Sequence, residues 1–224
     1  MSGWKPILYL ITPDYIGEGF FRLVEDALDG GPDVLQYRDK KSTRQTRTEV
    51  ARRLRRMCHD RGVAFVVDDD PYVARDSGAD LLHVGRDDPS IEEAREVVGN
   101  MPIGSSSYCS TSLARDLERR GSAYVAFGAF FRSPSKPEAA LCDKKTITEG
   151  LRAVRIPVYA IGGISQTNVK PLLEQGVSGV AVISSVFSSE NPKRAVLEYS
   201  GILAEYRCDR DPLSWFRRAG QAGP

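Results

Sequence analysis

Short apolar segments alternate with amphipathic segments eight times along this chain, and the repeat leaves few folds open to it. Continuous apolar runs bounded by turn residues are typical of strands buried on both faces. The segments between them have apolar residues at helical spacing, and most end at glycine. The predicted strands are Ile7–Thr12, Val34–Tyr37, Ala64–Val67, Leu81–Val84, a segment beginning at Ile103, Tyr124–Phe127, Val158–Ile161 and Val180–Ile183.

This alternation predicts an α/β fold with a parallel sheet, because parallel strands need crossover helices. Eight units in 224 residues close into a (β/α)8 TIM barrel more readily than they spread into an open sheet. No change of composition divides the repeat, so residues 1–206 are predicted to form one domain. Residues 207–224 are polar apart from Trp215 and Phe216, and we expect a short C-terminal tail that is disordered or packed on the outside of the barrel.

Composition excludes several classes of function. A formal net charge of +1 gives no basic field for nucleic acid, and no apolar run approaches the ~20 residues that a membrane span needs. The first residues lack the basic and apolar regions of a secretory signal. The four cysteines, Cys58, Cys109, Cys142 and Cys208, are scattered and form no CxxC pair, so we expect no zinc site and a reducing, cytoplasmic location.

Polar side chains alternate where the second predicted strand ends. In an extended strand Gln36, Arg38 and Lys40 share one face, and Tyr37 and Asp39 share the other. An amide, a guanidinium and an ammonium group aimed the same way can bind a multiply charged anion such as diphosphate. Taken alone, the same residues are equally consistent with a strand that runs out into a solvated basic loop.

Acidic residues follow the third and fourth strands, namely Asp68, Asp69, Asp70, Asp87 and Asp88. Active sites of such barrels form where the strands end, so these carboxylates are expected on one rim. Mg²⁺ binds one or two carboxylates together with substrate phosphates, which predicts a metal beside the diphosphate site. The alternative is that these aspartates only cap helices.

The ends of the last two strands predict a second phosphate site. Glycine lets the backbone approach a phosphate closely, and the loops after strands seven and eight often bind one. Gly162, Gly163, Ile183 and Ser184 are the candidates, although an ordinary turn also explains the glycine pair.

From Ile7 to Phe187 the chain resembles the thiamine phosphate synthase family. The resemblance rests on motifs in a fixed order: Tyr9–Thr12; Gln36, Arg38 and Lys40; Asp69; His83, Gly85 and Asp88; Ile103, Gly104 and Ser106; Tyr124–Phe131; Ser133, Ser135 and Lys136; and Ala160–Ile164. Each motif is weak alone, whereas their order and spacing together are specific.

The resemblance implies a transferase that joins hydroxymethylpyrimidine diphosphate to hydroxyethylthiazole phosphate and releases diphosphate. By the family pattern, Gln36, Arg38, Lys40 and Asp68 lie at the pyrimidine diphosphate, Ser106 lies near the pyrimidine, and Asp69 and Asp88 bind Mg²⁺. Ser133, Ser135 and Lys136 bind phosphate groups, and Gly163, Ile183 and Ser184 bind the thiazole phosphate. Arg38 and Lys136 are the implied catalytic residues, acting on the charge of the leaving group rather than as nucleophiles.

Three positions depart from the family pattern. The family usually has Asn at Asp68, Gln at Arg86, and Pro-Thr at Arg132 and Ser133. A further carboxylate beside a bound diphosphate is unfavourable unless its charge is offset. We therefore expect Asp68 and Arg86, on adjacent strand ends, to form an ion pair.

Two other functions stay open. One is an isomerase of the thiazole tautomerase type, which needs neither the diphosphate receptor nor the metal. The other is a non-catalytic phosphate-ligand binding protein, for which Asp68, Arg86 and Arg132 are the best support. His83 is expected to be a core side chain rather than a base, and the sequence leaves homo-oligomerisation and metal preference open.

Overall fold

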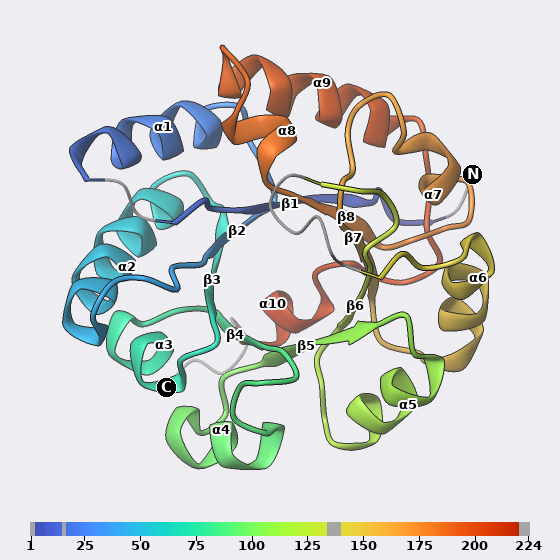
Figure 1. The fold of residues 1–224 in the computed structure, drawn as a ribbon, viewed down its shortest axis with the longest axis horizontal. Coiled ribbons are helices and arrows are strands. Elements are labelled where there is room, and N and C mark those ends of the chain that lie inside the picture. Colours follow the sequence, from blue (N-terminus) through green and yellow to red (C-terminus); the bar gives the residue numbers. More distant parts are fainter. Residues whose placement is uncertain (1–2, 15–16, 134–139, 220–224) are drawn as a thin grey trace.

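The computed structural model describes residues 3–14, 17–133 and 140–219. Eight parallel strands pair in chain order, and β8 pairs with β1 to close a barrel. Figure 1 shows the helices α1 to α9 as a ring outside the strands. The predicted single-domain TIM barrel is confirmed. The strands are β1 (Ile7–Ile11), β2 (Val34–Tyr37), β3 (Ala64–Asp68), β4 (Leu81–Val84), β5 (Ile103–Tyr108), β6 (Val125–Phe127), β7 (Val158–Ile161) and β8 (Gly179–Val182).

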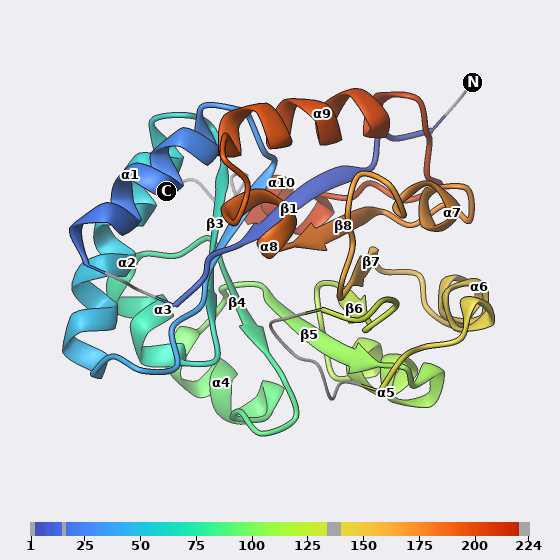
Figure 2. The same ribbon diagram turned by 45° about the horizontal axis from the view of Figure 1, so that its top comes forward.

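The helices of the described ranges follow the predicted pattern, with two short additions, α8 and α10. They are α1 (Glu18–Leu28), α2 (Arg44–His59), α3 (Pro71–Ser77), α4 (Ile91–Val98), α5 (Thr111–Arg119), α6 (Lys144–Ala153), α7 (Lys170–Leu173), α8 (Ser184–Phe187), α9 (Pro192–Ala204) and α10 (Ser214–Ala219). The short helix α8 directly follows β8, before the long helix α9 that packs along β1 (Figure 2). None of the helices in the described ranges has the length and apolarity that a membrane span requires.

Local sequence signals explain where the helices begin. The Thr43 side chain accepts from the backbone N of Thr46 at the start of α2. Ser90 and Glu93 form a reciprocal capping box at the start of α4. Such caps satisfy backbone N–H groups that have no partner within the helix, so α2 and α4 begin at defined residues.

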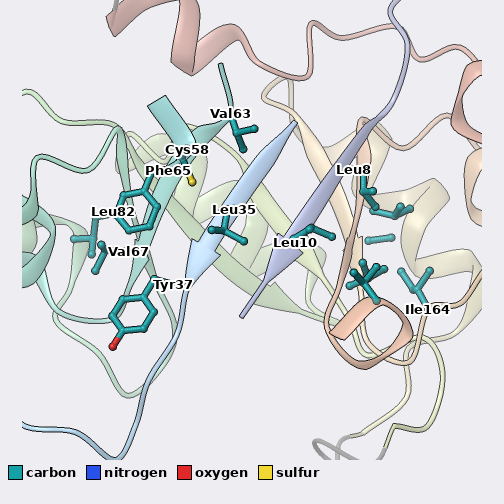
Figure 3. Packing of buried hydrophobic residues seen from close by; sticks show 14 of the residues in the cluster. Leu8, Leu10, Leu35, Tyr37, Cys58, Val63, Phe65, Val67, Leu82 and Ile164 are labelled. Atoms are coloured by element: carbon teal, nitrogen blue, oxygen red, sulfur yellow. The ribbon is translucent and has the colours of Figure 1, made fainter. Parts of the chain in front are cut away.

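Strand alternation separates two apolar layers. Leu8, Leu10 and Leu35 point outward and pack beneath the surrounding helices, as Figure 3 shows. Ile7 and Tyr9 point inward and belong to the cluster that fills the barrel. Because inward and outward positions alternate, the inward residues nearest each strand's C-terminal end are left to form a site.

The C-terminal segment differs from our expectation. Figure 1 shows α10 inside the ring of strands, and Trp215 is 3% exposed within the barrel's inner cluster. Its Nε1 donates to the Tyr159 hydroxyl at 2.9 Å. For the described residues 207–219, the expectation of a disordered or outer tail is therefore wrong, because the barrel interior buries an indole that would otherwise be exposed to water.

Candidate active site

A pocket of about 800 Å³ opens at the C-terminal ends of the strands, and every strand or the loop after it contributes to its wall. This volume suits one or two small ligands. The predicted site residues that line it are Gln36, Arg38, Lys40, Asp68, Asp69, Asp88, Ser106, Ser133, Gly163, Ile183 and Ser184. The predicted Ser135 and Lys136 lie outside the residues that the structure describes.

The end of β2 places its side chains as the alternation predicts. Gln36, Arg38 and Lys40 face the pocket, whereas Tyr37 packs in the outer apolar layer. Thr12 Oγ1 accepts from the backbone N of Arg38 at 3.1 Å, which ties this strand end to the end of β1. The predicted division of the two faces is confirmed.

Asp68 does not pair with Arg86. Its Oδ1 accepts from Gln36 Nε2 at 2.7 Å, and its Oδ2 lies 3.8 Å from Arg38 Nε. Arg86 instead stacks over the Tyr108 ring, 4.4 Å from its centroid. The expected Asp68–Arg86 ion pair is wrong, because Arg38, which directly follows β2, reaches Asp68 at the end of β3, while Arg86 lies exposed in the loop after β4.

Burial sets the ionisation of Asp68. Desolvation, reinforced by the charge of Asp69, raises the pKa of the Asp68 carboxyl well above its usual range, while Lys40 and Arg38 oppose the shift. The raised pKa favours the neutral carboxyl, so burial, together with the nearby cations, limits the additional negative charge that Asp68 brings to the rim.

Asp69, Asp88 and Lys40 form a compact charged cluster. Lys40 Nζ bonds to Asp69, and it lies 3.9 Å from Asp88 Oδ1. Burial, together with the hydrogen bond to and charge of Asp69, raises the pKa of Asp88 to about 6. For Asp69, burial alone would raise the pKa, but hydrogen bonds with Asp88 and Lys40 hold it below its usual value.

This cluster fits a hard cation. An ammonium group already occupies the space beside two carboxylates, and Mg²⁺ needs only one or two carboxylates when substrate phosphates complete its shell. In the described part of the chain no group of three or more His, Cys, Asp or Glu side chains forms a complete metal cage. Asp69 has a positive φ of 66°, a conformation uncommon outside glycine that is often found at functional sites.

Asp70 has the structural role that we weighed for the acidic residues. Its carboxylate accepts from the backbone N of Tyr72 and Val73 and caps α3. Arg44 and Arg47 both lie 3.0 Å from its Oδ2. Of the three consecutive aspartates, only Asp68 and Asp69 line the pocket.

The glycine pair after β7 is required by packing. Gly162 and Gly163 have φ values of 98° and 64°. A Cβ on Gly162 would lie 2.4 Å from the Ala129 side chain, and one on Gly163 would lie 2.5 Å from the Phe131 carbonyl oxygen. The loop after β6 therefore crosses directly over these residues, and both glycines also face the pocket.

Two groups near the pocket, a pair of tyrosines and a disulfide, were not predicted as part of the site. Tyr9 and Tyr124 are fully buried, and their hydroxyls form hydrogen bonds below the pocket together with His83. The inward alternation of β1 could have identified Tyr9. Cys109, in the pocket wall, forms a disulfide with Cys142. Scattered spacing gave no signal for this bond, because the pairing depends on two loops meeting in space. The reducing compartment that we expected from unpaired cysteines therefore loses that support.

The comparisons with known proteins agree on a family. Residues 8–186 match the family model described as thiamine monophosphate synthase. The thiamine-phosphate synthase of Thermoplasma acidophilum is 39% identical over 199 residues, which are 89% of this chain and 93% of that protein. That of Thiobacillus denitrificans is 41% identical over 194 residues, 86% and 91% of the two chains. The solved thiamine phosphate pyrophosphorylase from Pyrococcus furiosus has a TM-score of 0.83 at 33% identity, covering 90% of this chain and 96% of that one.

Proposed function

The chain belongs to the thiamine monophosphate synthase family and is a transferase of thiamine biosynthesis, and we propose that its pocket joins hydroxymethylpyrimidine diphosphate to hydroxyethylthiazole phosphate. One observation carries this proposal. Two cations, Arg38 and Lys40, and two carboxylates, Asp69 and Asp88, converge in one pocket. That combination suits a diphosphate with its metal better than it suits a lone monophosphate.

The diphosphate end of the pyrimidine substrate lies at β2 in this proposal. Arg38 binds it through a planar guanidinium fork, and Lys40 adds a compact charge. Lys40 exchanges its contact with Asp69 for the diphosphate, while Gln36 and Ser106 face the pyrimidine ring. Asp69 and Asp88 would hold Mg²⁺, which would supply charge neutralisation for the departing diphosphate.

The thiazole phosphate lies at the opposite wall. Gly163, Ile183 and Ser184 end β7 and β8, the usual phosphate position in this barrel architecture. Ser133, in the loop after β6, also lines the pocket. Its hydroxyl can donate a further hydrogen bond to the phosphate. The role of Ser135 and Lys136 at the phosphates remains our prediction from the family pattern.

The reaction needs charge neutralisation and alignment rather than a protein nucleophile. The bond between the pyrimidine methylene carbon and oxygen breaks, and its electron pair leaves with diphosphate. The electron-rich aminopyrimidine ring stabilises the cation, and the thiazole nitrogen lone pair then forms the new carbon–nitrogen bond. Arg38 stabilises the developing negative charge, and the two subsites hold the reacting atoms together.

Both substrates carry phosphate charges that retain them inside a cell, and we therefore propose a cytoplasmic location. Small molecules are the proposed partners, and neither nucleic acid nor membrane has a role in the reaction.

The proposal is tested by product balance with purified protein. With both substrates and Mg²⁺, we expect one thiamine phosphate for each diphosphate released, and no release when either substrate is omitted. Isomerisation of the thiazole phosphate without diphosphate release would instead indicate the tautomerase function. Saturable binding of thiazole phosphate without turnover would indicate a binding protein.

A further inference from the structure

A chain of hydrogen bonds crosses the barrel below the pocket, and we refer to its five members, Ser106, His83, Tyr124, Tyr9 and Gln36, as the floor relay. Ser106 Oγ lies 2.9 Å from His83 Nε2, and His83 Nδ1 lies 2.8 Å from the Tyr124 hydroxyl. The Tyr124 hydroxyl lies 2.8 Å from that of Tyr9, which donates to Gln36 Oε1 at 2.7 Å. The relay therefore connects two side chains on different walls of the pocket.

Asp68 fixes one end of the floor relay. Gln36 Nε2 donates to Asp68 Oδ1 at 2.7 Å, so the amide oxygen of Gln36 points to Tyr9. Arg38 lies beside the other carboxyl oxygen, which leaves Oδ1 to accept from Gln36.

Counting protons gives the relay a direction. Tyr9 has one hydroxyl proton and donates it to Gln36, so its oxygen accepts from Tyr124. The Tyr124 proton is then used, and its oxygen accepts from His83 Nδ1–H. We take His83 to be a neutral imidazole, which has only one proton, so that its Nε2 accepts from the Ser106 hydroxyl. Burial raises the pKa of both phenols well above the usual range, which keeps each proton in place.

We propose that the floor relay fixes the hydrogen-bonding polarity of the pocket. It turns Ser106 into an acceptor toward the ligand, because the Ser106 proton is held by His83. It turns Gln36 into a donor, because one N–H of its amide is bound to Asp68 and the second remains for the ligand. Tyr9, Tyr124 and His83 are therefore positioning residues that determine specificity.

The ligand that matches this polarity carries an amino group and an unprotonated ring nitrogen. The inference rests on the proposed function, and it deepens it by naming what selects the pyrimidine. An exocyclic amino group donates to Ser106, and a ring nitrogen accepts from Gln36. An oxo substituent in place of the amino group would face Ser106 lone pair to lone pair, which leaves two acceptors unpaired in a buried site.

The direction of the relay can be measured without any ligand. The chain has two histidines, His83 and the exposed His59, so ¹⁵N NMR of labelled protein separates their imidazole signals. We expect the His83 ring to be protonated on Nδ1 alone at neutral pH. In Tyr124→Phe the Nδ1–H group loses its acceptor, and we expect a mixture of both tautomers. A wild-type His83 protonated on Nε2, alone or with Nδ1, would overturn the proposal.

The specificity claim is tested by binding of the amino- and oxo-pyrimidine monophosphates, which lack the diphosphate leaving group. For the wild type we expect the amino compound to bind about 10- to 100-fold more tightly, as one unpaired buried polar group implies. Tyr124→Phe and Tyr9→Phe should reduce that ratio to about threefold or less. Two variants are used so that poor folding of one does not decide the result.

Tyr159→Phe is the matched control. It removes a buried tyrosine hydroxyl whose partners are Pro212 and Trp215, outside the relay, and the ratio should not change. If both relay variants keep the wild-type ratio, the inference is wrong. If the wild type turns over both natural substrates yet binds the amino- and oxo-pyrimidine monophosphates equally well, the inference is wrong while the proposed function stands. Failure of the proposed function appears separately, as the absence of turnover.

Discussion

Asp68 shows how one residue can be accommodated at a site that binds anions. A carboxylate beside a diphosphate repels it, yet this side chain is bound by Gln36 and lies 3.8 Å from Arg38. Arg38 also lies 3.4 Å from Asp14, so it is held between two carboxyl groups while it faces the pocket. The residue that compensates Asp68 is thus the proposed ligand of the diphosphate rather than Arg86.

The absence of contact between Asp68 and Arg86 leads to a double-mutant prediction. We expect the effects of Asp68→Asn and Arg86→Gln on the free energy of unfolding to add within about 0.5 kcal/mol, as for residues without shared partners. Urea unfolding of the wild type, both single variants and the double variant measures this. A coupling energy above about 1 kcal/mol would show that Asp68 and Arg86 do interact, as in the expected ion pair.

Asp88 provides the residue-scale prediction for the metal. We expect Asp88→Asn to weaken Mg²⁺ binding at least about tenfold. Even the replacement of a residue that only hydrogen-bonds to a metal ligand typically lowers metal affinity by about that factor. Calorimetric titration of Mg²⁺ in the presence of diphosphate measures the affinity. Asp87→Asn is the control, because this neighbouring carboxylate is exposed and should change the affinity by less than about threefold. Equal losses in the two variants would contradict the assignment.

At the scale of elements, the contact between the loops after β5 and β6 is the feature that could not be predicted from the sequence. Cys109 begins the first loop and Cys142 ends the second, 33 residues apart in the chain. The disulfide joins the wall of the pocket to the segment that leads into α6. Neither loop has a strong local signal, and only closure of the barrel brings the two sulfurs together.

We expect this disulfide to stabilise the fold by about 3–4 kcal/mol, the loop-closure value for this separation. Reduction should therefore lower the midpoint of urea unfolding, while the Cys109→Ser/Cys142→Ser variant should not respond to reductant. Thiol titration of the unfolded, unreduced protein should find two thiols, those of Cys58 and Cys208. Four thiols before reduction would show that the bond does not form.

For the whole molecule, the sequence was sufficient wherever local periodicity decides the structure. The eight alternations predicted the barrel, and the alternation after Leu35 correctly assigned Gln36 and Tyr37 to opposite faces. It was insufficient wherever the partner comes from a distant element. The contact between Asp68 and Arg38 and the burial of Trp215 inside the barrel both depend on closure of the sheet, which no local pattern contains.

Trp215 supplies a prediction at this scale, because it fills the N-terminal end of the barrel beneath Tyr124 and Tyr159. We expect Trp215→Ala to lower the free energy of unfolding by about 3–5 kcal/mol, as for large buried aromatic residues. Its half-buried neighbour gives the matched control, and Phe216→Ala should cost clearly less. Similar small losses in both variants would mean that α10 does not contribute to the core.

The central claim is that the cations at the end of β2 bind the diphosphate that leaves. The most direct test compares Arg38→Ala with Lys41→Ala in diphosphate release with both substrates and Mg²⁺. Lys41 also pairs with Asp14, but its side chain is 78% exposed. We expect Arg38→Ala to lower kcat/KM for the pyrimidine diphosphate at least about 100-fold, with Lys41→Ala within about twofold of the wild type. An Arg38→Ala variant as active as Lys41→Ala would contradict the account.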